Sequence, residues 1–153
     1  MSHSDPLRRY VRQTRFAPLG EEGQRRLMAS GALVCGCGAL GSTLANLLVR
    51  AGVGTVRIVD RDFVEASNLQ RQVLFDEEDA AAGLPKAVAA AARLARINST
   101  VRIEPVVADI DFRNLPQLAE GMQVIVDGTD NFETRLLLND LALESGTPGV
   151  YGG

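Results

Sequence analysis

Short apolar runs alternate with amphipathic segments along the chain. Runs that are apolar, or that alternate apolar and polar residues, predict strands at residues 32–35, 56–59, 101–107 and 124–126. Apolar residues at helical spacing predict helices at residues 42–50, 85–97, 115–120 and about 132–144. Residues 149–151 have the composition of a fifth strand that is just beginning. This alternation predicts an α/β fold, a Rossmann-like and mostly parallel sheet with helices on both faces.

The pattern changes at about residue 30. We expect an N-terminal arm and helix in residues 1–30, and the strand-and-helix domain in residues 31–153. The sequence ends as the fifth strand opens, so we expect this domain to be incomplete at its C-terminus. In the helix at residues 42–50, which Gly52 ends, we expect Leu44, Leu47 and Leu48 to face the core.

Length and charge exclude several classes of protein. The chain has 153 residues, enough for one domain, and its 16 basic and 19 acidic residues give a net charge of -3. This balance disfavours binding to nucleic acid or to an anionic membrane surface. The N-terminus is polar, and no stretch approaches the roughly 18 apolar residues of a membrane span. We therefore expect a cytoplasmic protein.

The two cysteines, Cys35 and Cys37, lie two residues apart in an apolar run. Their side chains would point to opposite faces of a strand, which makes a mutual disulfide implausible. No second cysteine pair exists to complete a zinc site, so we expect no zinc and two buried thiols.

Lys86 is the one lysine among 16 basic residues, the other 15 being arginine. Codon bias accounts for the excess of arginine, but a compact ammonium differs from a guanidinium where it meets a phosphate. Lys86 also begins a predicted helix, where the helix dipole disfavours a cation unless an anion is bound nearby.

A glycine motif joins the first predicted strand to the next helix. Gly36, Gly38 and Gly41 follow the G-x-G-x-x-G pattern, and Asp60 closes the following strand 24 residues after Gly36. In this context the glycines let phosphate oxygens meet amide groups at a helix N-terminus, and the acid accepts hydrogen bonds from ribose hydroxyls. The alternative is that the glycines only pack the helix on the strand. The motif by itself permits NAD, FAD or ATP.

Four further motifs accompany the glycines in a fixed order. They are Arg9 to Gln13, Asp60-Arg61-Asp62 with Ser67 to Gln72, Pro85-Lys86, and Val126 to Asn131. The ordered set resembles the MoeB/ThiF/HesA family of ATP-dependent adenylyltransferases, which activate ubiquitin-like proteins. The resemblance runs from about Leu7 to the last residue and is far more specific than any one motif. Family members usually continue well beyond this point, so the resemblance implies that the chain is the N-terminal portion of such an enzyme.

The resemblance implies a role for each matching residue. ATP would be held by the glycine loop and the other motif residues, which are Gly36, Gly38, Ala39, Leu40, Gly41, Asp60, Asp62, Asn68, Arg71, Gln72, Lys86, Asp127, Thr129, Asp130 and Asn131. Asp130 would be the Mg²⁺ ligand, and Arg71 and Lys86 would neutralise charge as pyrophosphate leaves. Arg12 would reach the neighbour's nucleotide across a homodimer interface. The position of Asp130, just after a buried strand at the carboxyl edge of the sheet, agrees with a cation site.

The implied reaction is adenylation of a ubiquitin-like sulfur carrier at the carboxylate of its C-terminal Gly-Gly. Alternatives remain open at this stage. Arg12 could be solvated, Arg71 could form a surface ion pair, and Asp130 stands where a helix N-cap is expected. The chain could also be a non-catalytic ATP-binding module or an inactive fragment.

Three other functions fit less well. An NAD-dependent oxidoreductase gives no reason for residues 67–72 or Asp130, and the single histidine, His3, lies in a terminal tail. A tRNA dehydratase shares the nucleotide fold, but residues 67–72 look closer to the carrier activators. The terminal Gly152-Gly153 mimics a carrier tail, but it follows a βαβ chain instead of a β-grasp domain.

Overall fold

The computed structural model describes residues 5–152, so His3 and Gly153 lie outside the described residues. The strands are β1 (Gly31–Cys35), β2 (Thr55–Val59), β3 (Arg102–Val106), β4 (Val124–Asp127) and β5 (Gly149–Tyr151). The α-helices are α1 (Val11–Thr14), α2 (Gly20–Met28), α3 (Ala39–Ala51), α4 (Glu77–Ala81), α5 (Lys86–Ile97), α6 (Leu115–Ala119) and α7 (Phe132–Ser145). Two 3₁₀ turns, η1 and η2, cover Arg8–Tyr10 and Ala66–Asn68.

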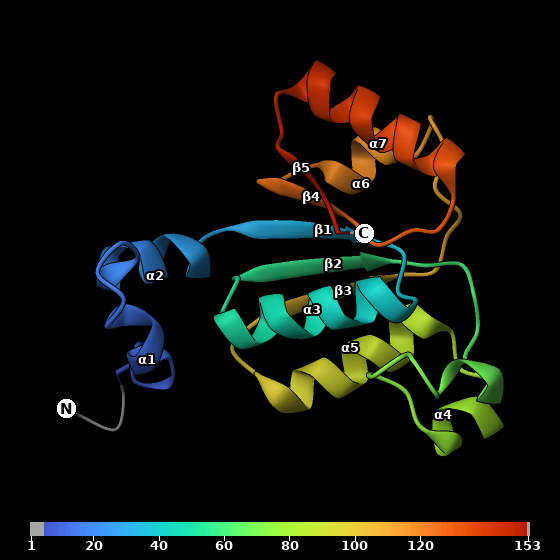
Figure 1. Ribbon diagram of the computed structural model, residues 1–153, viewed down its shortest axis with the longest axis horizontal. Helices are drawn as coiled ribbons and strands as arrows, with labels where there is room; N and C mark the ends of the chain where they lie inside the picture. Colours follow the sequence, from blue (N-terminus) through green and yellow to red (C-terminus); the bar gives the residue numbers. More distant parts are fainter. Residues whose placement is uncertain (1–4, 153) are drawn as a thin grey trace.

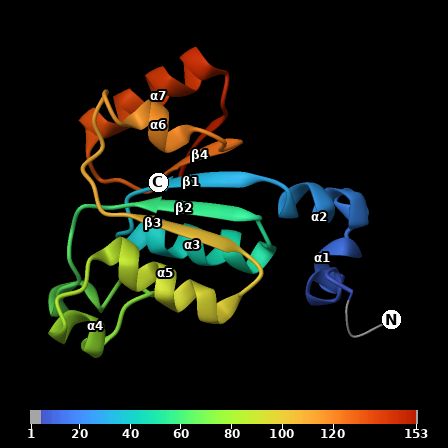
Figure 2. The ribbon, with the colours of Figure 1, turned by 180° about the vertical axis from the view of Figure 1, so that it is seen from behind.

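The strands form one parallel sheet in the order β3-β2-β1-β4-β5. Helices α3 and α5 cover one face, and α6 and α7 lie on the other (Figure 1 and Figure 2). The predicted Rossmann-like fold is therefore confirmed. The chain runs from β1 outward to β2 and β3, then returns to β4 on the other side of β1. In such sheets the crevice for a ligand opens where this direction reverses, at the carboxyl ends of β1 and β4.

The sheet separates two apolar clusters. Ala32 and Val34 of β1 face α3 and α5, whereas Leu33 and Cys35 face α6 and α7. β1 is completely buried because both of its faces are covered. Cys37, just after the strand, packs on the α3 side, opposite to Cys35. Both thiols are free and buried, as predicted.

The prediction that Leu47 belongs to the core is wrong, because its side chain is 57% exposed. Helix α3 turns Ala45 and Val49 toward the sheet, and Leu44 and Leu48 pack beside them. Leu47 is two residues from each buried position, about 200° around the helix, and so points to the opposite side.

The N-terminal segment packs against the ends of two later helices. Asn98, which is completely buried, donates hydrogen bonds to the Tyr10 hydroxyl and to the Val49 carbonyl, both at 2.9 Å. Gln24, also fully buried, donates to the Ala51 carbonyl. A buried amide needs such partners, so these contacts fix η1 and α2 to the domain.

Two element boundaries differ from the sequence pattern. Helix α3 begins at Ala39, three residues earlier than predicted, because Gly38 already has extended backbone and starts the first turn. Helix α4 falls in a stretch expected to be a loop, where Asp76 caps it by accepting from the amides of Glu78 and Asp79. Among the described helices, none has the length and apolar character to cross a membrane.

Candidate functional site

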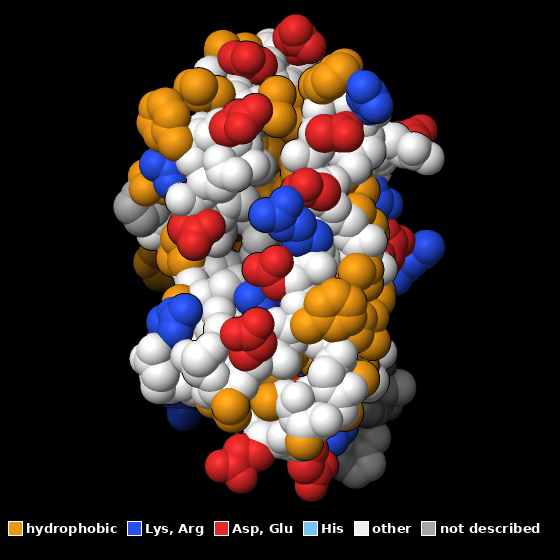
Figure 3. Space-filling model, turned by 90° about the vertical axis from the view of Figure 1, so that its right-hand side faces the viewer, with side chains coloured by type: hydrophobic (Ala, Val, Ile, Leu, Met, Phe, Trp, Pro, Cys, Tyr) orange, Lys and Arg blue, Asp and Glu red, His pale blue; other side chains and the backbone are white. Residues whose placement is uncertain are grey.

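A cavity of about 990 Å³ opens at the carboxyl ends of the strands. Acidic and basic side chains lie close together across the middle of this face (Figure 3). The predicted site residues that line the cavity are Gly36, Gly38, Ala39, Leu40, Asp60, Asp62, Asn68, Arg71, Gln72, Lys86, Thr129, Asp130 and Asn131. Gly41, Asp127 and Arg12 do not line it.

The glycines of the loop have different roles. Gly36 has a φ of 82°, a conformation that favours glycine. A Cβ on Gly41 would stand 1.9 Å from the Gly36 carbonyl oxygen, so Gly41 allows α3 to approach the loop. A Cβ on Gly38 would meet only the Gln72 amide at 3.9 Å, so that position faces open space. The first turn of α3 has no side-chain cap, which leaves amide donors turned toward the cavity.

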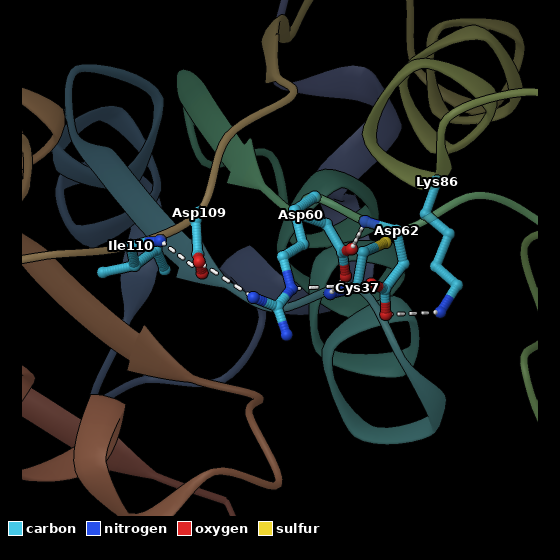
Figure 4. Close-up of polar contacts among 7 residues, drawn as sticks. Cys37, Asp60, Asp62, Lys86, Asp109 and Ile110 are labelled. Carbon is cyan, nitrogen blue, oxygen red and sulfur yellow. Dashed lines mark hydrogen bonds and ion pairs between the residues drawn. The ribbon is translucent and has the colours of Figure 1, made fainter.

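Asp60 is held firmly at the end of β2. Its Oδ2 accepts a hydrogen bond from the Cys37 amide at 2.6 Å, and its Oδ1 accepts one from the Asp62 amide at 2.7 Å (Figure 4). Each oxygen keeps a second lone pair for a hydroxyl donor. The glycine loop and the acid of the predicted nucleotide motif are therefore joined directly.

Lys86 is only 7% exposed and begins α5. Its Nζ lies 3.2 Å from Oδ2 of Asp62, and Figure 4 shows it extending from the helix toward that carboxylate. The expected anion near this lysine is therefore supplied, within the described protein, by Asp62. A phosphate role for Lys86 stays a prediction.

The segment around η2 contributes three predicted residues to the same cavity. Asn68 is buried, and its Oδ1 accepts from the Glu65 amide at 3.2 Å. Arg71 is exposed and donates to the Ser67 carbonyl at 3.1 Å. Gln72 is buried, yet its Oε1 has no hydrogen-bond partner within residues 5–152. A buried amide without a partner at a cavity wall is suited to hydrogen-bond a ligand.

Asp127, at the end of β4, has a structural position. It is 4% exposed, its Oδ1 accepts from the amide and hydroxyl of Thr129, and its Oδ2 lies 3.2 Å from Nε of Arg135. Three donors therefore hold this carboxylate, which is not among the residues that line the cavity. It shapes the turn that leads to Asp130.

Asp130 is exposed at the cavity and has no hydrogen bond or ion pair within the described part of the chain. The N-cap expected at this residue is one position later: Asn131 Oδ1 accepts from the amides of Glu133 and Thr134. The Asp130 carboxylate is thus left for another partner. No cluster of three His, Cys, Asp or Glu side chains suited to a metal occurs among the described residues.

Arg12 lies on α1, exposed and away from the lining of the cavity. Within one chain it does not meet the other predicted residues. Its predicted action on a neighbour's nucleotide stays a prediction.

Several lining residues were missed by the sequence patterns. Arg61 forms an ion pair with Asp109 through Nη1 and Oδ2 at 2.8 Å, and Asp109 also accepts from the Ile110 amide (Figure 4). Arg135 and Tyr151 line the opposite side, with the guanidinium 3.8 Å from the centre of the Tyr151 ring. Arg61 lies between the predicted site residues Asp60 and Asp62, so its place in the sequence was a signal that could have identified it. Asp109 and Tyr151 come into the site only through the strand order.

The thiol nearest the site is not suited to be a nucleophile. Burial, together with the charge of Asp60, raises the pKa of Cys37 to about 12, although Lys86 opposes this. The thiol therefore stays protonated near neutral pH.

A model of the ThiF family matches residues 10–153, nearly the whole chain. The chain belongs to the ThiF family. This confirms the family predicted from the ordered motifs and explains why they occur together around one cavity.

Two curated relatives show how much of a longer protein this chain matches. The chain is 51% identical over 144 residues to the sulfur carrier protein ThiS adenylyltransferase of Bacillus subtilis, covering 94% of this chain and 43% of that protein. It is 44% identical over 146 residues to the SAMP-activating enzyme E1 of Haloferax volcanii, covering 95% and 53%. The chain thus spans about half the length of these curated relatives.

Solved structures agree on the ThiF fold. The E. coli tRNA N6-threonylcarbamoyladenosine dehydratase TcdA, in complex with ATP, superimposes with a TM-score of 0.87 at 26% identity, covering 95% of this chain and 58% of that one. E. coli MccB with ATP gives a TM-score of 0.86 at 26% identity, covering 95% and 45%. Both were solved with ATP, the nucleotide that the family resemblance implies.

Proposed function

We propose that this ThiF-family chain binds ATP and Mg²⁺ and adenylates the C-terminal Gly-Gly carboxylate of a ubiquitin-like sulfur carrier. The main support is that four residues far apart in the sequence line one cavity: Asp60, Arg71, Lys86 and Asp130. This cavity lies beside the N-terminus of α3, which has no side-chain cap. The name of the Bacillus relative supports this choice of substrate, and the ATP complexes of TcdA and MccB support the nucleotide.

The cavity fits a nucleoside triphosphate. Its volume lies at the upper end of the usual range for ligand pockets, roughly 300–1,000 Å³. Asp60 has lone pairs left for ribose hydroxyls, and the first turn of α3 offers amides to a phosphate. At Gly38 a side chain would project into open space, so the missing Cβ leaves room for the phosphates.

Asp130 fits the Mg²⁺ role. A single unpaired carboxylate suits Mg²⁺, which takes one or two protein carboxylates and completes its shell with water and phosphate oxygens. When bound, the ion would offset the phosphate charge.

The protein's part in the reaction is positioning and charge compensation. One carboxylate oxygen of the carrier attacks the α-phosphorus, the bond from that phosphorus to the bridging oxygen breaks, and pyrophosphate leaves with the electron pair. The products are an acyl-adenylate and pyrophosphate, with no proton transfer and no protein nucleophile. Arg71 and Lys86 hold the leaving group, and backbone amides hold the α-phosphate.

Arg12 completes the proposal at the level of the homodimer. Its exposed position outside the cavity supports action on the nucleotide of a second copy rather than on its own.

Carrier-dependent exchange of radioactive pyrophosphate into ATP tests the function. We expect exchange with ATP only when a Gly-Gly carrier is present, and tighter binding of ATP than of NAD. ATP binding without exchange, for any carrier of the sulfur pathways, would favour a non-catalytic module. Tighter binding of NAD would favour an oxidoreductase.

A further inference from the structure

Arg135 is a cation of the cavity that the proposed reaction has not used. It lies in the first turns of α7 and lines the cavity on the side of β4 and β5. Its Nε is paired with Asp127 at 3.2 Å, and Tyr151 covers the face of its guanidinium. Its two terminal nitrogens have no hydrogen-bond partner among residues 5–152.

These contacts hold the guanidinium in place. Asp127 is itself fixed by Thr129, and the Tyr151 ring favours a cation stacked over its face. The side chain is only 30% exposed. A guanidinium that is already ordered loses little entropy on binding, and its free N–H donors can make charge-assisted hydrogen bonds to a carboxylate oxygen.

In the proposed complex, the ribose and the phosphates of the nucleotide lie in different parts of the cavity. Asp60 fixes the ribose beside β2, and the end of α3 fixes the phosphates at the centre. Arg71 and Lys86, which would hold the leaving pyrophosphate, come from the η2 segment and α5, on the α3 face of the sheet. Arg135 comes from α7, on the opposite face (Figure 1).

An in-line displacement at phosphorus brings the nucleophile from the side opposite to the leaving group. The nucleophile therefore enters on the side of α7. The incoming carboxylate and the phosphates that it approaches are both negatively charged and repel each other. Arg135 is the cation there that can offset this repulsion.

We infer that Arg135 binds the C-terminal carboxylate of the acceptor and, after transfer, the carbonyl oxygen of the acyl-adenylate. The inference rests on the proposed function. One carboxylate oxygen accepts hydrogen bonds from the Arg135 fork while the other attacks the α-phosphorus. The bound oxygen then becomes the acyl carbonyl oxygen, so Arg135 keeps its ligand throughout the step.

The test uses two stable nucleosides. Adenosine 5′-sulfamate occupies the nucleotide side alone, and its N-glycylglycyl derivative adds the acyl group of the product. We expect the wild-type chain to bind the derivative about tenfold or more tightly, from hydrogen bonds to a charged donor. Arg135→Gln should reduce this gain to about twofold or less, with the affinity for adenosine 5′-sulfamate unchanged.

Two variants serve as controls. Arg135→Lys keeps the positive charge but not the paired N–H donors of the guanidinium. It should keep part of the extra affinity for the glycylglycyl derivative. Arg113→Gln removes an arginine stacked on Phe112, outside the cavity, and should keep all of it.

Three results would overturn the inference: no gain in the wild type, a full gain in Arg135→Gln, or equal weakening of both nucleosides in that variant. The last would mean that Arg135 only supports the Asp127 turn. A separate measurement tests the proposed function. If the wild type binds the glycylglycyl derivative more tightly but shows no carrier-dependent pyrophosphate exchange, the proposed function is wrong.

Discussion

The two sides of the cavity use their charges differently. On the side of β2 and β3, Asp60 accepts from two backbone amides, Asp62 pairs with Lys86, and Asp109 pairs with Arg61. On the side of β4 and β5, Asp130 has no partner among the described residues and the fork of Arg135 is free. On the first side each of these carboxylates already has a partner in the protein, whereas the second side presents unpaired charge.

This difference separates binding from chemistry. A ribose offers the same neutral hydroxyls before and after the reaction, so a rigid, paired acid suits it. The reacting groups are a metal-bound phosphate and a carboxylate, both charged, and unpaired charges interact with these without first breaking a protein contact. Mutations of the paired acids should therefore affect stability and affinity, and mutations on the unpaired side should affect turnover.

Asp130→Asn should have the largest effect. We expect carrier-dependent exchange to fall about 100-fold or more, because the carboxylate proposed to hold Mg²⁺ at the reacting phosphates is lost. Unfolding free energy should change by about 0.5 kcal/mol or less, since the carboxylate forms no hydrogen bond or ion pair with the described residues. Asp140→Asn, which removes an exposed carboxylate of the following helix α7, is the control and should exchange like wild type. Wild-type exchange in Asp130→Asn would remove the distinction between the two sides.

Gly41→Ala and Gly38→Ala compare packing with ligand binding in one loop. The Cβ that Gly41→Ala adds would overlap the Gly36 carbonyl, so urea unfolding should show a loss of about 1–3 kcal/mol. The Cβ that Gly38→Ala adds would meet no close atom, so stability should stay within about 0.5 kcal/mol while ATP affinity falls. Equal destabilisation by both substitutions would contradict this division.

The Lys86–Asp62 pair tests the paired side. Asp62→Ala leaves a buried ammonium without its carboxylate, and we expect a stability loss of about 1–3 kcal/mol in thermal unfolding. Lys86→Met leaves Asp62, whose side chain is mostly solvated, and should be nearly neutral for stability. ATP titration should instead show about tenfold weaker binding for Lys86→Met. Equal stability of the two variants would contradict this difference between the buried ammonium and the solvated carboxylate.

The smallest expected effect is on the pH dependence of stability, and it comes from two carboxylates outside the cavity, Asp76 and Asp111. Hydrogen bonds from the amide of Asp79 and from Arg93 and Glu78 lower the pKa of Asp76 below its ordinary 3.8, and the amides of Asn114 and Arg113 lower that of Asp111. Because these pKa values are lower in the folded state, their contribution is present above the unfolded pKa and is lost as pH falls through the folded value.

We therefore expect the unfolding temperature to drop below about pH 4. Asp76→Asn should lower it at pH 7 and flatten its dependence on acid. An unchanged acid slope in this variant would show that the caps are not responsible.

Much of the fold follows from local patterns. The buried run before Gly36 and the acid at Asp60 predicted the first βαβ unit, because strand, glycine turn and helix are all encoded within about 30 residues. Leu47 was misplaced because three leucines at nearly helical spacing do not fix which two face the sheet. Helix α4 was missed because its cap, Asp76, is followed by acids rather than by an apolar face.

The site was predictable where its residues belong to motifs. Asn68, Arg71, Lys86 and Asp130 were found from their order along the chain, and the structure brings them to one cavity. Arg135 was not found, because its importance comes from contacts with Asp127 and Tyr151, which depend on β4 and β5 being neighbours. Such pairings between elements have no local signal.

The most direct test follows oxygen from the carrier into the nucleotide. A carrier whose C-terminal carboxylate contains ¹⁸O is incubated with ATP, Mg²⁺ and the wild-type chain, and the product is cleaved with hydroxylamine at its acyl carbon. If a carboxylate oxygen attacks the α-phosphorus, mass spectrometry will find one ¹⁸O in the released AMP. Label in inorganic phosphate, with ADP as the other product, would place the attack at the γ-phosphorus and contradict the proposed reaction.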